Sequence, residues 1–396
     1  MSLSDDERML ARALKTTVRR LGWDIRRYVA EYRDACVPLR TRSQRTRGSV
    51  LLAYIVEPFL SATAPSVAHT HFQESRLIAE AYLERGYDVD VIDYRHGTFV
   101  PRRDYDIIVS ARTNLEALAN RSARTQHVIA HLDTAHYVYN NRAAYDRLLA
   151  LQQRRGLTST SVRIVEPNLA IERASIGAVL GNRTFTATTY AYARKPLYPL
   201  PVPSAVSLPW IERDYDACRR RFLWMGSAGF VHKGLDLVLE TFATNPSLEL
   251  DVCGPLAQDR EFAAQFEREL YDTPNIHAVG WIDVGSDRFI DIARSTVGFV
   301  YPSCSEGQAG SAVVALHAGL IPIVSRQTGI DVGDFGLVLS NCSAAEIDAA
   351  VRHISELSTV ELRQRSRAAW EYAQAHHTPS AYRQAYDTML DAVLTK

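Results

Sequence analysis

Two loops contain most of the residues whose types and spacing could do chemistry. The first, GSAGFVHKGLD, covers residues 226–236 and places Gly226, Gly229 and Gly234 around Lys233 at the expected start of a helix. Glycines let the backbone approach a ligand closely, and a lysine adds a full charge to the positive end of a helix dipole. The pattern predicts an anion site, although its residue order is not that of a Walker A motif. A purely structural glycine turn is the alternative.

The second loop lies in PSCSEGQAGSAVVALHAGLIPIVS, residues 302–325, where small residues surround one carboxylate, Glu306. A helix beginning near Ser311 would offer free backbone N–H groups to anionic or hydroxyl oxygens. Glu306 cannot bind a phosphate, so beside an anion site it would accept hydrogen bonds from neutral hydroxyls, such as those of a sugar. Alternatively, Ser305 and Gln308 form a capping box, and Glu306 only favours the helix start.

Strand and helix patterns alternate on both sides of these loops. In the first half, the expected strands are 49–56, 88–94, 105–111, 127–132 and 178–182, with a helix from about Thr70 to Arg85. In the second half, they are 221–227, 248–254, 275–281, 297–303, 320–325 and 335–340, followed by helices over 344–357, 359–377 and 381–396. Such alternation indicates parallel βαβ units, whose ligands bind beyond the carboxyl ends of the strands. The sequence therefore predicts an α/β protein with two Rossmann-like, doubly wound domains facing across a cleft.

A proline-rich stretch, KPLYPLPVPSAVSLP at residues 195–209, separates the two halves. Prolines cannot sit inside helices or central strands, so this stretch is the expected linker. We therefore expect four parts: a basic amphipathic helical arm over 1–48, an N-terminal Rossmann-like domain over 49–205, a C-terminal Rossmann-like domain over 206–378, and a last helix over 379–396 that could pack back on the N-terminal domain.

The N-terminal arm is strongly basic. Residues 8–47 contain twelve Lys/Arg and three Asp/Glu, and apolar residues recur there at helical spacing. This pattern suits an anionic membrane surface, and a helix packed on its own domain with a solvated basic face is the alternative. Nucleic acid is not an expected partner, because the arm shows no recognised binding motif or aromatic stacking array.

The remaining composition is typical of a soluble cytoplasmic protein, which would lie at the inner membrane face if the arm binds lipid. The five cysteines show no CxxC pair and no Cys/His cluster, so reduced thiols are expected rather than disulfides or a structural zinc. No apolar run reaches the roughly 18 residues of a membrane span, and the N-terminus lacks the apolar core of a signal peptide.

The second half of the chain resembles glycosyltransferase family 4, a group of retaining transferases that use nucleotide sugars and have the GT-B fold. The resemblance covers about residues 220–335 and rests on the GS…HKG loop, LELDVCG, NIHAVG, PSCSEG…AGLIPIVS and TGIDV, in that order. It implies that Lys233 contacts the donor diphosphate, that Glu306 contacts the donor sugar, and that the amides after Glu306 face the phosphates. The donor-binding residues that it implies are Gly226, Ser227, Gly229, Lys233, Glu306, Gly307, Gln308, Ala309, Gly310, Ser311 and Gly329.

Three features depart from that family. Its second glutamate, which holds the ribose, is replaced here by Val314. Its arginine a few residues before the lysine is missing, with Ser227 or Ala228 in its place. The first domain has AHTHFQESRLIAEA where the family has a Gly-Gly loop. The ribose and diphosphate contacts must therefore be partly rebuilt.

The first domain should supply the acceptor side and an acid/base group. In HVIAHLDTAH, His131 and Asp133 lie where a strand should end, and family members often place a histidine near this point. A neutral histidine there could hydrogen-bond a sugar hydroxyl or move a proton. The candidate catalytic residues are therefore Glu306, Lys233 and His131, each with a structural role as the alternative.

Other polar residues compete for these roles or imitate a site. The competing candidates are His69, His71 and Arg112, and Thr184 or Thr186 could cap a cleft-lining helix. Asp88 and Asp90 spell the DxD metal signature of the other main glycosyltransferase fold, but they lie in a strand pattern and are interpreted as a solvated strand edge. No GxGxxG opens either domain, which argues against a dehydrogenase.

Together these observations predict a hexosyltransferase-like enzyme, and the resemblance implies that it works without a metal. It would move a sugar from a nucleoside-diphosphate donor to a hydroxyl of a glycan or lipid-linked acceptor, with the retention that the resemblance implies and with no cofactor besides the donor. A catalytically silent nucleotide-sugar-binding or scaffold subunit is one alternative. A nucleotide-sugar epimerase of the same fold is the other.

Overall fold

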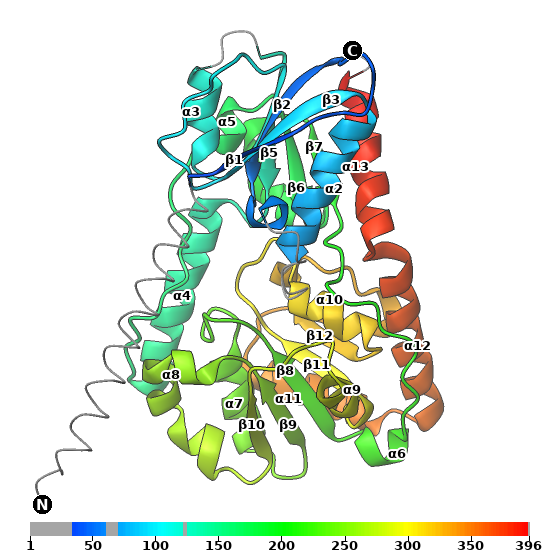
Figure 1. The fold of residues 1–396 in the computed structure, drawn as a ribbon. Helices are drawn as coiled ribbons and strands as arrows, with labels where there is room; N and C mark the ends of the chain where they lie inside the picture. Colours follow the sequence, from blue (N-terminus) through cyan, green and yellow to red (C-terminus); the bar gives the residue numbers. More distant parts are fainter. Residues whose placement is uncertain (1–33, 61–69, 122–124, 395–396) are drawn as a thin grey trace, which may run out of the picture.

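The computed structural model describes residues 34–60, 70–121 and 125–394, and Figure 1 shows its two sheets one above the other. Within these residues the first sheet has seven strands in the order β1-β3-β2-β4-β5-β6-β7. They are β1 (Cys36–Leu39), β2 (Gly48–Tyr54), β3 (Tyr87–Asp93), β4 (Ile107–Ala111), β5 (His127–Leu132), β6 (Ile176–Leu180) and β7 (Leu197–Leu200). Only β1 pairs antiparallel, against β3.

Helices cover both faces of the first sheet, so every residue of its inner strand β2 after Gly48 is buried, with no alternation between buried and exposed positions. Leu52 of β2 packs in one core with α2 (Thr70–Glu84) and α13 (Pro379–Leu394), whereas Leu51 packs on the opposite face with α3 (Asn114–Asn120). The short helix α5 (Ala170–Arg173) and the 3-10 helices η1 (Glu57–Phe59) and η2 (Thr186–Ala193) complete this domain.

The second sheet is wholly parallel. Over the continuous stretch 125–394 it has six strands in the order β10-β9-β8-β11-β12-β13. They are β8 (Arg221–Met225), β9 (Glu249–Cys253), β10 (Ile276–Gly280), β11 (Gly298–Tyr301), β12 (Ile321–Ser325) and β13 (Leu337–Leu339). The strand order reverses between β8 and β11, so the loops that follow these two strands line the crevice in which such sheets bind ligands.

Helices surround the second sheet. They are α6 (Tyr215–Cys218), α7 (Leu235–Ala243), α8 (Arg260–Gln265), α9 (Asp287–Arg294), α10 (Gly310–His317), α11 (Ala344–Glu356) and α12 (Thr359–His376), with η3 (Leu256–Gln258), η4 (Arg268–Asp272), η5 (Arg326–Thr328) and η6 (Gly333–Phe335). In Figure 1, α4 (Tyr137–Arg155) runs down one side from the first domain to the second, and α12 and α13 return along the other. The predicted pair of doubly wound domains is confirmed.

Two predicted boundaries need correction. Residues 36–39 form β1, an edge strand of the first sheet, so this part does not belong to a helical arm ending at 48; residues 1–33 lie outside the described residues. The proline-rich stretch 195–209 begins as β7 rather than as a linker. Pro199 is accommodated because β7 is an edge strand, which can leave its outer side without N–H donors.

The DxD pair is not a solvated edge. Asp90 is buried in β3, which pairs with β1 and is not at the sheet edge, and its carboxylate accepts hydrogen bonds from Arg40, Arg103 and Tyr105 at 3.1, 3.0 and 2.8 Å. Across the described residues, no group of three His, Cys, Asp or Glu side chains is arranged to hold a metal ion. None of the described helices has the length and apolarity that crossing a membrane requires.

Candidate active site

Lys233 lies at the end of the glycine-rich loop that follows β8. Gly234, in the left-handed conformation at φ 73°, starts α7, so the lysine side chain sits just outside the amino end of that helix. The side chain is buried, and Nζ donates to Ser227 Oγ at 2.6 Å. Burial lowers the pKa of Lys233 to about 8, although the nearby Glu306 acts in the opposite direction. The loop thus holds a desolvated cation whose partner in the described chain is a neutral hydroxyl.

Glu306 lies in the corresponding loop after β11 and is also buried, at 8% exposure. Its Oε1 accepts hydrogen bonds from Tyr301 at 3.1 Å and Ser303 at 3.2 Å, and its Oε2 lies 3.5 Å from Arg163 Nη1. Burial alone would raise the pKa of Glu306, but Arg163 and Lys233 together bring it below its usual value. The carboxylate is therefore ionised, and two cations flank it.

The capping-box interpretation of this loop is wrong. The residue that precedes α10 is Ala309, which makes no side-chain cap, and Ser305 Oγ has no hydrogen-bond partner among the described residues. The Gln308 side chain instead accepts from the Val202 amide at 2.6 Å and donates to the Gly329 carbonyl at 2.8 Å. Gln308 therefore connects the loop to Val202, just after the last strand of the first domain, and to Gly329 of the second domain.

The loop presses against the first domain at Gly307. A Cβ atom at this position would lie 2.6 Å from the Asp133 carbonyl oxygen, so only glycine fits. Thr186 Oγ1 donates to the Gly307 carbonyl at 2.5 Å. The Ala309 amide donates to the Thr328 carbonyl at 2.9 Å, whereas the amides of Gly310 and Ser311, in the first turn of α10, are among the donors that a ligand could use.

His131 lies near the end of β5 and is fully buried. It is two residues before Asp133, whose backbone contacts Gly307. Neither ring nitrogen has a hydrogen-bond partner in the described part of the chain. Its ring centroid is 4.4 Å from that of Tyr54, and its Nε2 is 4.0 Å from Glu74 Oε2. Burial lowers the pKa of His131, so the imidazole is neutral near pH 7.

His71 belongs to the same cluster, at the start of α2. Its Nδ1 lies 2.9 Å from Glu74 Oε2 and 2.5 Å from the Tyr54 hydroxyl. Burial opposes the charge on His71, but Glu74 outweighs it and raises the pKa of this histidine. Of the competing candidates, His71 is therefore bound to a carboxylate, whereas His69 lies outside the described residues.

Arg112 is neutralised by a neighbour. It follows β4 and forms two parallel hydrogen bonds to Asp133, at 3.0 and 2.8 Å. Burial would raise the pKa of Asp133, but Arg112 lowers it to about 2.

The two candidate capping threonines instead join the domains. The Thr184 carbonyl accepts a hydrogen bond from Arg326, and Thr186 Oγ1 donates to the Gly307 carbonyl, so neither caps a free helix end.

Sequence reasoning missed Arg163, Tyr54 and Glu74, because none belongs to a motif. The only signal for Arg163 was indirect: the glycine-rich loop lacks the arginine that the resembled family has. Val314, in the place of the expected second glutamate, is buried in the apolar core of the second domain and offers no polar group.

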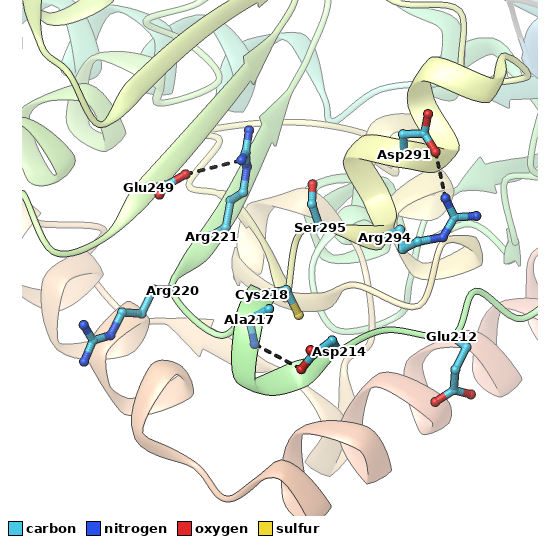
Figure 2. Close-up of a pocket in the computed structure, with 10 residues that line it drawn as sticks. All are labelled: Glu212, Asp214, Ala217, Cys218, Arg220, Arg221, Glu249, Asp291, Arg294 and Ser295. Atoms are coloured by element: carbon cyan, nitrogen blue, oxygen red, sulfur yellow. Dashed lines mark hydrogen bonds and ion pairs between the residues drawn. The ribbon is translucent and has the colours of Figure 1, made fainter.

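A pocket of about 470 Å³ lies far from these residues and does not belong to the site (Figure 2). It opens where β8 and β9 begin, at Arg221 and Glu249, which form an ion pair at 3.3 Å. This is the amino edge of the second sheet, whereas ligands of parallel sheets bind at the carboxyl edge. The pocket is therefore not the candidate active site.

No protein-family model matches the chain, and no curated protein matches it. Solved structures do match. Sucrose-phosphate synthase from Thermosynechococcus elongatus is 15% identical, with a TM-score of 0.60 over 88% of this chain and 99% of that one. Anabaena HepE with UDP and glucose is 12% identical, with a TM-score of 0.54 over 87% and 99%. An E. coli structure described as trehalose-6-phosphate, bound with UDP-2-fluoro glucose, is 9% identical, with a TM-score of 0.55 over 86% and 98%.

The chain has the GT-B fold. It spans 57% of the pneumococcal O-GlcNAc transferase GtfA and 54% of TarM, to which it is also similar. In GT-B terms, the loops with Lys233 and Glu306 belong to the second domain, and the cluster around His131 belongs to the first. Membership of family 4 stays a prediction.

Proposed function

We propose that this protein is a glycosyltransferase that moves a sugar from a nucleoside diphosphate to a hydroxyl of a glycan or lipid-linked acceptor, with retention. The observation that carries the proposal is the nearness of a buried cation, Lys233, to a buried carboxylate, Glu306, at the switch point of the second sheet. Such a pair suits a ligand with an anionic part next to a neutral polyhydroxyl part. A nucleotide sugar has this composition.

The second domain would hold the donor. Lys233 would exchange Ser227 for a phosphate oxygen, and the amides of Gly310 and Ser311 would add donors at the amino end of α10. Glu306 would accept hydrogen bonds from sugar hydroxyls. Positive groups placed at the diphosphate stabilise the charge that develops on the leaving group, so the chemistry needs no metal on this account.

The first domain would supply the acceptor side. His131 is neutral, buried and without a partner among the described residues, so its ring nitrogens can hydrogen-bond a sugar hydroxyl when the cleft fills. Tyr54 and Glu74 hold the ring from behind. In this scheme His131 orients the transferred sugar or its acceptor.

Incubation with a panel of nucleotide sugars, with and without acceptors, tests this proposal through release of the nucleoside diphosphate. Lys233→Ala and Glu306→Ala should each lower turnover by about 100-fold, because they remove charged contacts to the reacting groups. Arg142→Ala, at an exposed ion pair on α4, is the matched control and should keep wild-type turnover. Unchanged turnover and binding in both site variants would contradict the assignment.

Two alternatives keep the fold. A silent binding subunit is favoured by the apolar Val314, and it would bind a nucleotide in calorimetry yet release none with any acceptor. An epimerase needs acid/base carboxylates in the cleft, but Glu74 is bound to His71 and Tyr54, and Asp133 is bound to Arg112. The site therefore favours the transferase.

We also propose that the basic segment 8–47 binds an anionic membrane surface at the cytoplasmic face, where lipid-linked acceptors would lie. Its support is the sequence pattern, twelve Lys/Arg against three Asp/Glu along an apolar stripe. Vesicles of phosphatidylglycerol should pull down the full chain, with binding that weakens as salt rises. The apolar stripe lies within residues 9–29, so binding that is unchanged after residues 1–33 are deleted would contradict the role given to this stripe.

A further inference from the structure

The connection after α4, residues 157–169, is attached to the second domain although it joins two elements of the first. At the end of α4, Arg154 pairs with Asp236 of α7 at 2.7 Å. Beyond the helix, the Thr160 amide donates to Glu261 at 2.7 Å and Ser161 Oγ donates to Asp259 at 2.8 Å. The connection therefore keeps its place beside the loops of the second sheet.

Arg163 lies in the part of this connection that is held from both sides. Its carbonyl accepts a hydrogen bond from Asn140 of α4 at 3.3 Å. Two residues later, Val165 exchanges hydrogen bonds with the Asn141 side chain at 2.8 and 2.9 Å. With Ser161 bound on the other side, the backbone at Arg163 is positioned before any ligand arrives.

The Arg163 side chain reaches the glycine-rich loop. Its Cδ lies 3.3 Å from the point where a Cβ on Gly229 would stand, and its Nη1 lies 3.5 Å from Glu306 Oε2. The same guanidinium helps to lower the pKa of Lys233, which places both cations in one electrostatic environment. Because the side chain is 43% exposed and its contact with Glu306 is long, it can change partner at little cost.

We propose that Arg163 is the second cation of the donor diphosphate site, and that the connection after α4 positions it beside the glycine-rich loop. This inference rests on the proposed function. The loop has no arginine between Gly226 and Lys233. Arg163, from the connection after α4, lies next to Gly229 of this loop. When a donor enters, Arg163 leaves Glu306 for the phosphates, and Glu306 turns to the sugar hydroxyls. A guanidinium can bind a phosphate through two parallel hydrogen bonds.

Calorimetry with nucleoside diphosphates and monophosphates tests the inference, with UDP, GDP and ADP and their monophosphates as probes. Arg163→Ala should weaken binding of the preferred diphosphate by about tenfold or more, and binding of the monophosphate by much less. Arg163→Lys should recover part of the loss, since it restores charge without the planar fork. Arg142→Ala on α4 is the control and should bind as the wild type does.

A double variant separates phosphate binding from a merely structural pairing with Glu306. If Arg163 only neutralises Glu306, then Arg163→Ala should have no effect on diphosphate binding in a Glu306→Gln background. If Arg163 binds phosphate, the same loss should appear in both backgrounds, because the probe carries no sugar for Glu306 to contact.

The outcomes distinguish the inference from the function on which it rests. A wild-type protein that binds no nucleotide or nucleotide sugar overturns both. If the wild type and Arg163→Ala bind the diphosphate with equal affinity, the role given to Arg163 is wrong, but the transferase proposal is unaffected.

Discussion

At the scale of single residues, the burial of Lys233 should make the affinity for a diphosphate depend on pH. Burial brings its pKa to about 8, so the free protein loses this charge as the pH rises above 8, whereas an exposed lysine would keep it to above 10. A bound diphosphate favours the charged form, so binding must take up a proton at high pH. We therefore expect the affinity for the diphosphate to be constant near pH 7 and to fall by up to about tenfold per unit above pH 8.

Calorimetric titrations between pH 7 and 9.5 check this expectation. Lys233→Arg keeps its charge over this range and should bind with little dependence on pH. The neighbours Glu306 and His232 both have lowered pKa values, His232 at about 4, so neither changes charge in this window. A wild-type affinity that does not change up to pH 9.5 would contradict the role given to Lys233.

At the scale of elements, α4 connects the two domains, and Arg154 attaches its end to the second domain. This arginine pairs with Asp236, whose carboxylate is fully buried, and with Glu240. Arg154→Ala would leave Asp236 buried without its partner, at an expected cost of about 2 kcal/mol, reduced from the usual range because Arg154 is partly exposed. Chemical denaturation should show this loss.

Two further variants calibrate the measurement. Arg154→Ala combined with Asp236→Asn should recover most of the lost stability, since it removes the unpaired charge. Arg142→Ala, at a pair that is 82% and 65% exposed, should change the free energy of unfolding by less than about 0.5 kcal/mol. If Arg154→Ala and Arg142→Ala change the free energy of unfolding equally, the contact between α4 and the second domain does not stabilise the protein.

At the scale of the whole molecule, the chain ends by completing the core of the domain with which it began. Tyr386 of α13 is fully buried beside Tyr82 of α2, with ring centroids 6.1 Å apart. Since α12 and α13 continue from one domain to the other, we expect the two domains to unfold together. Tyr386→Ala should then destabilise the protein by about 3–5 kcal/mol.

Tryptophan fluorescence can report this coupling in a Trp23→Phe background, because the other four tryptophans, Trp210, Trp224, Trp281 and Trp370, all lie in the second domain. Tyr386→Ala, which changes only the first-domain core, should shift the tryptophan unfolding transition to lower denaturant. Tyr386→Phe loses only the hydrogen bond to Tyr82 and should shift it far less. A tryptophan transition at the wild-type midpoint in Tyr386→Ala would mean that the domains unfold independently.

The sequence by itself determined the alternation of strands and helices, the two doubly wound domains, and the two loops that carry Lys233 and Glu306. These are local properties, since periodicity and glycine spacing act over a few residues. Tertiary structure alone decided which distant residues meet there. Arg163 reaches Glu306 across 143 positions, Gly307 contacts Asp133, and β1 pairs with β3 beside Asp90. Contacts between distant segments depend on how the elements and the two domains pack, which no local spacing records.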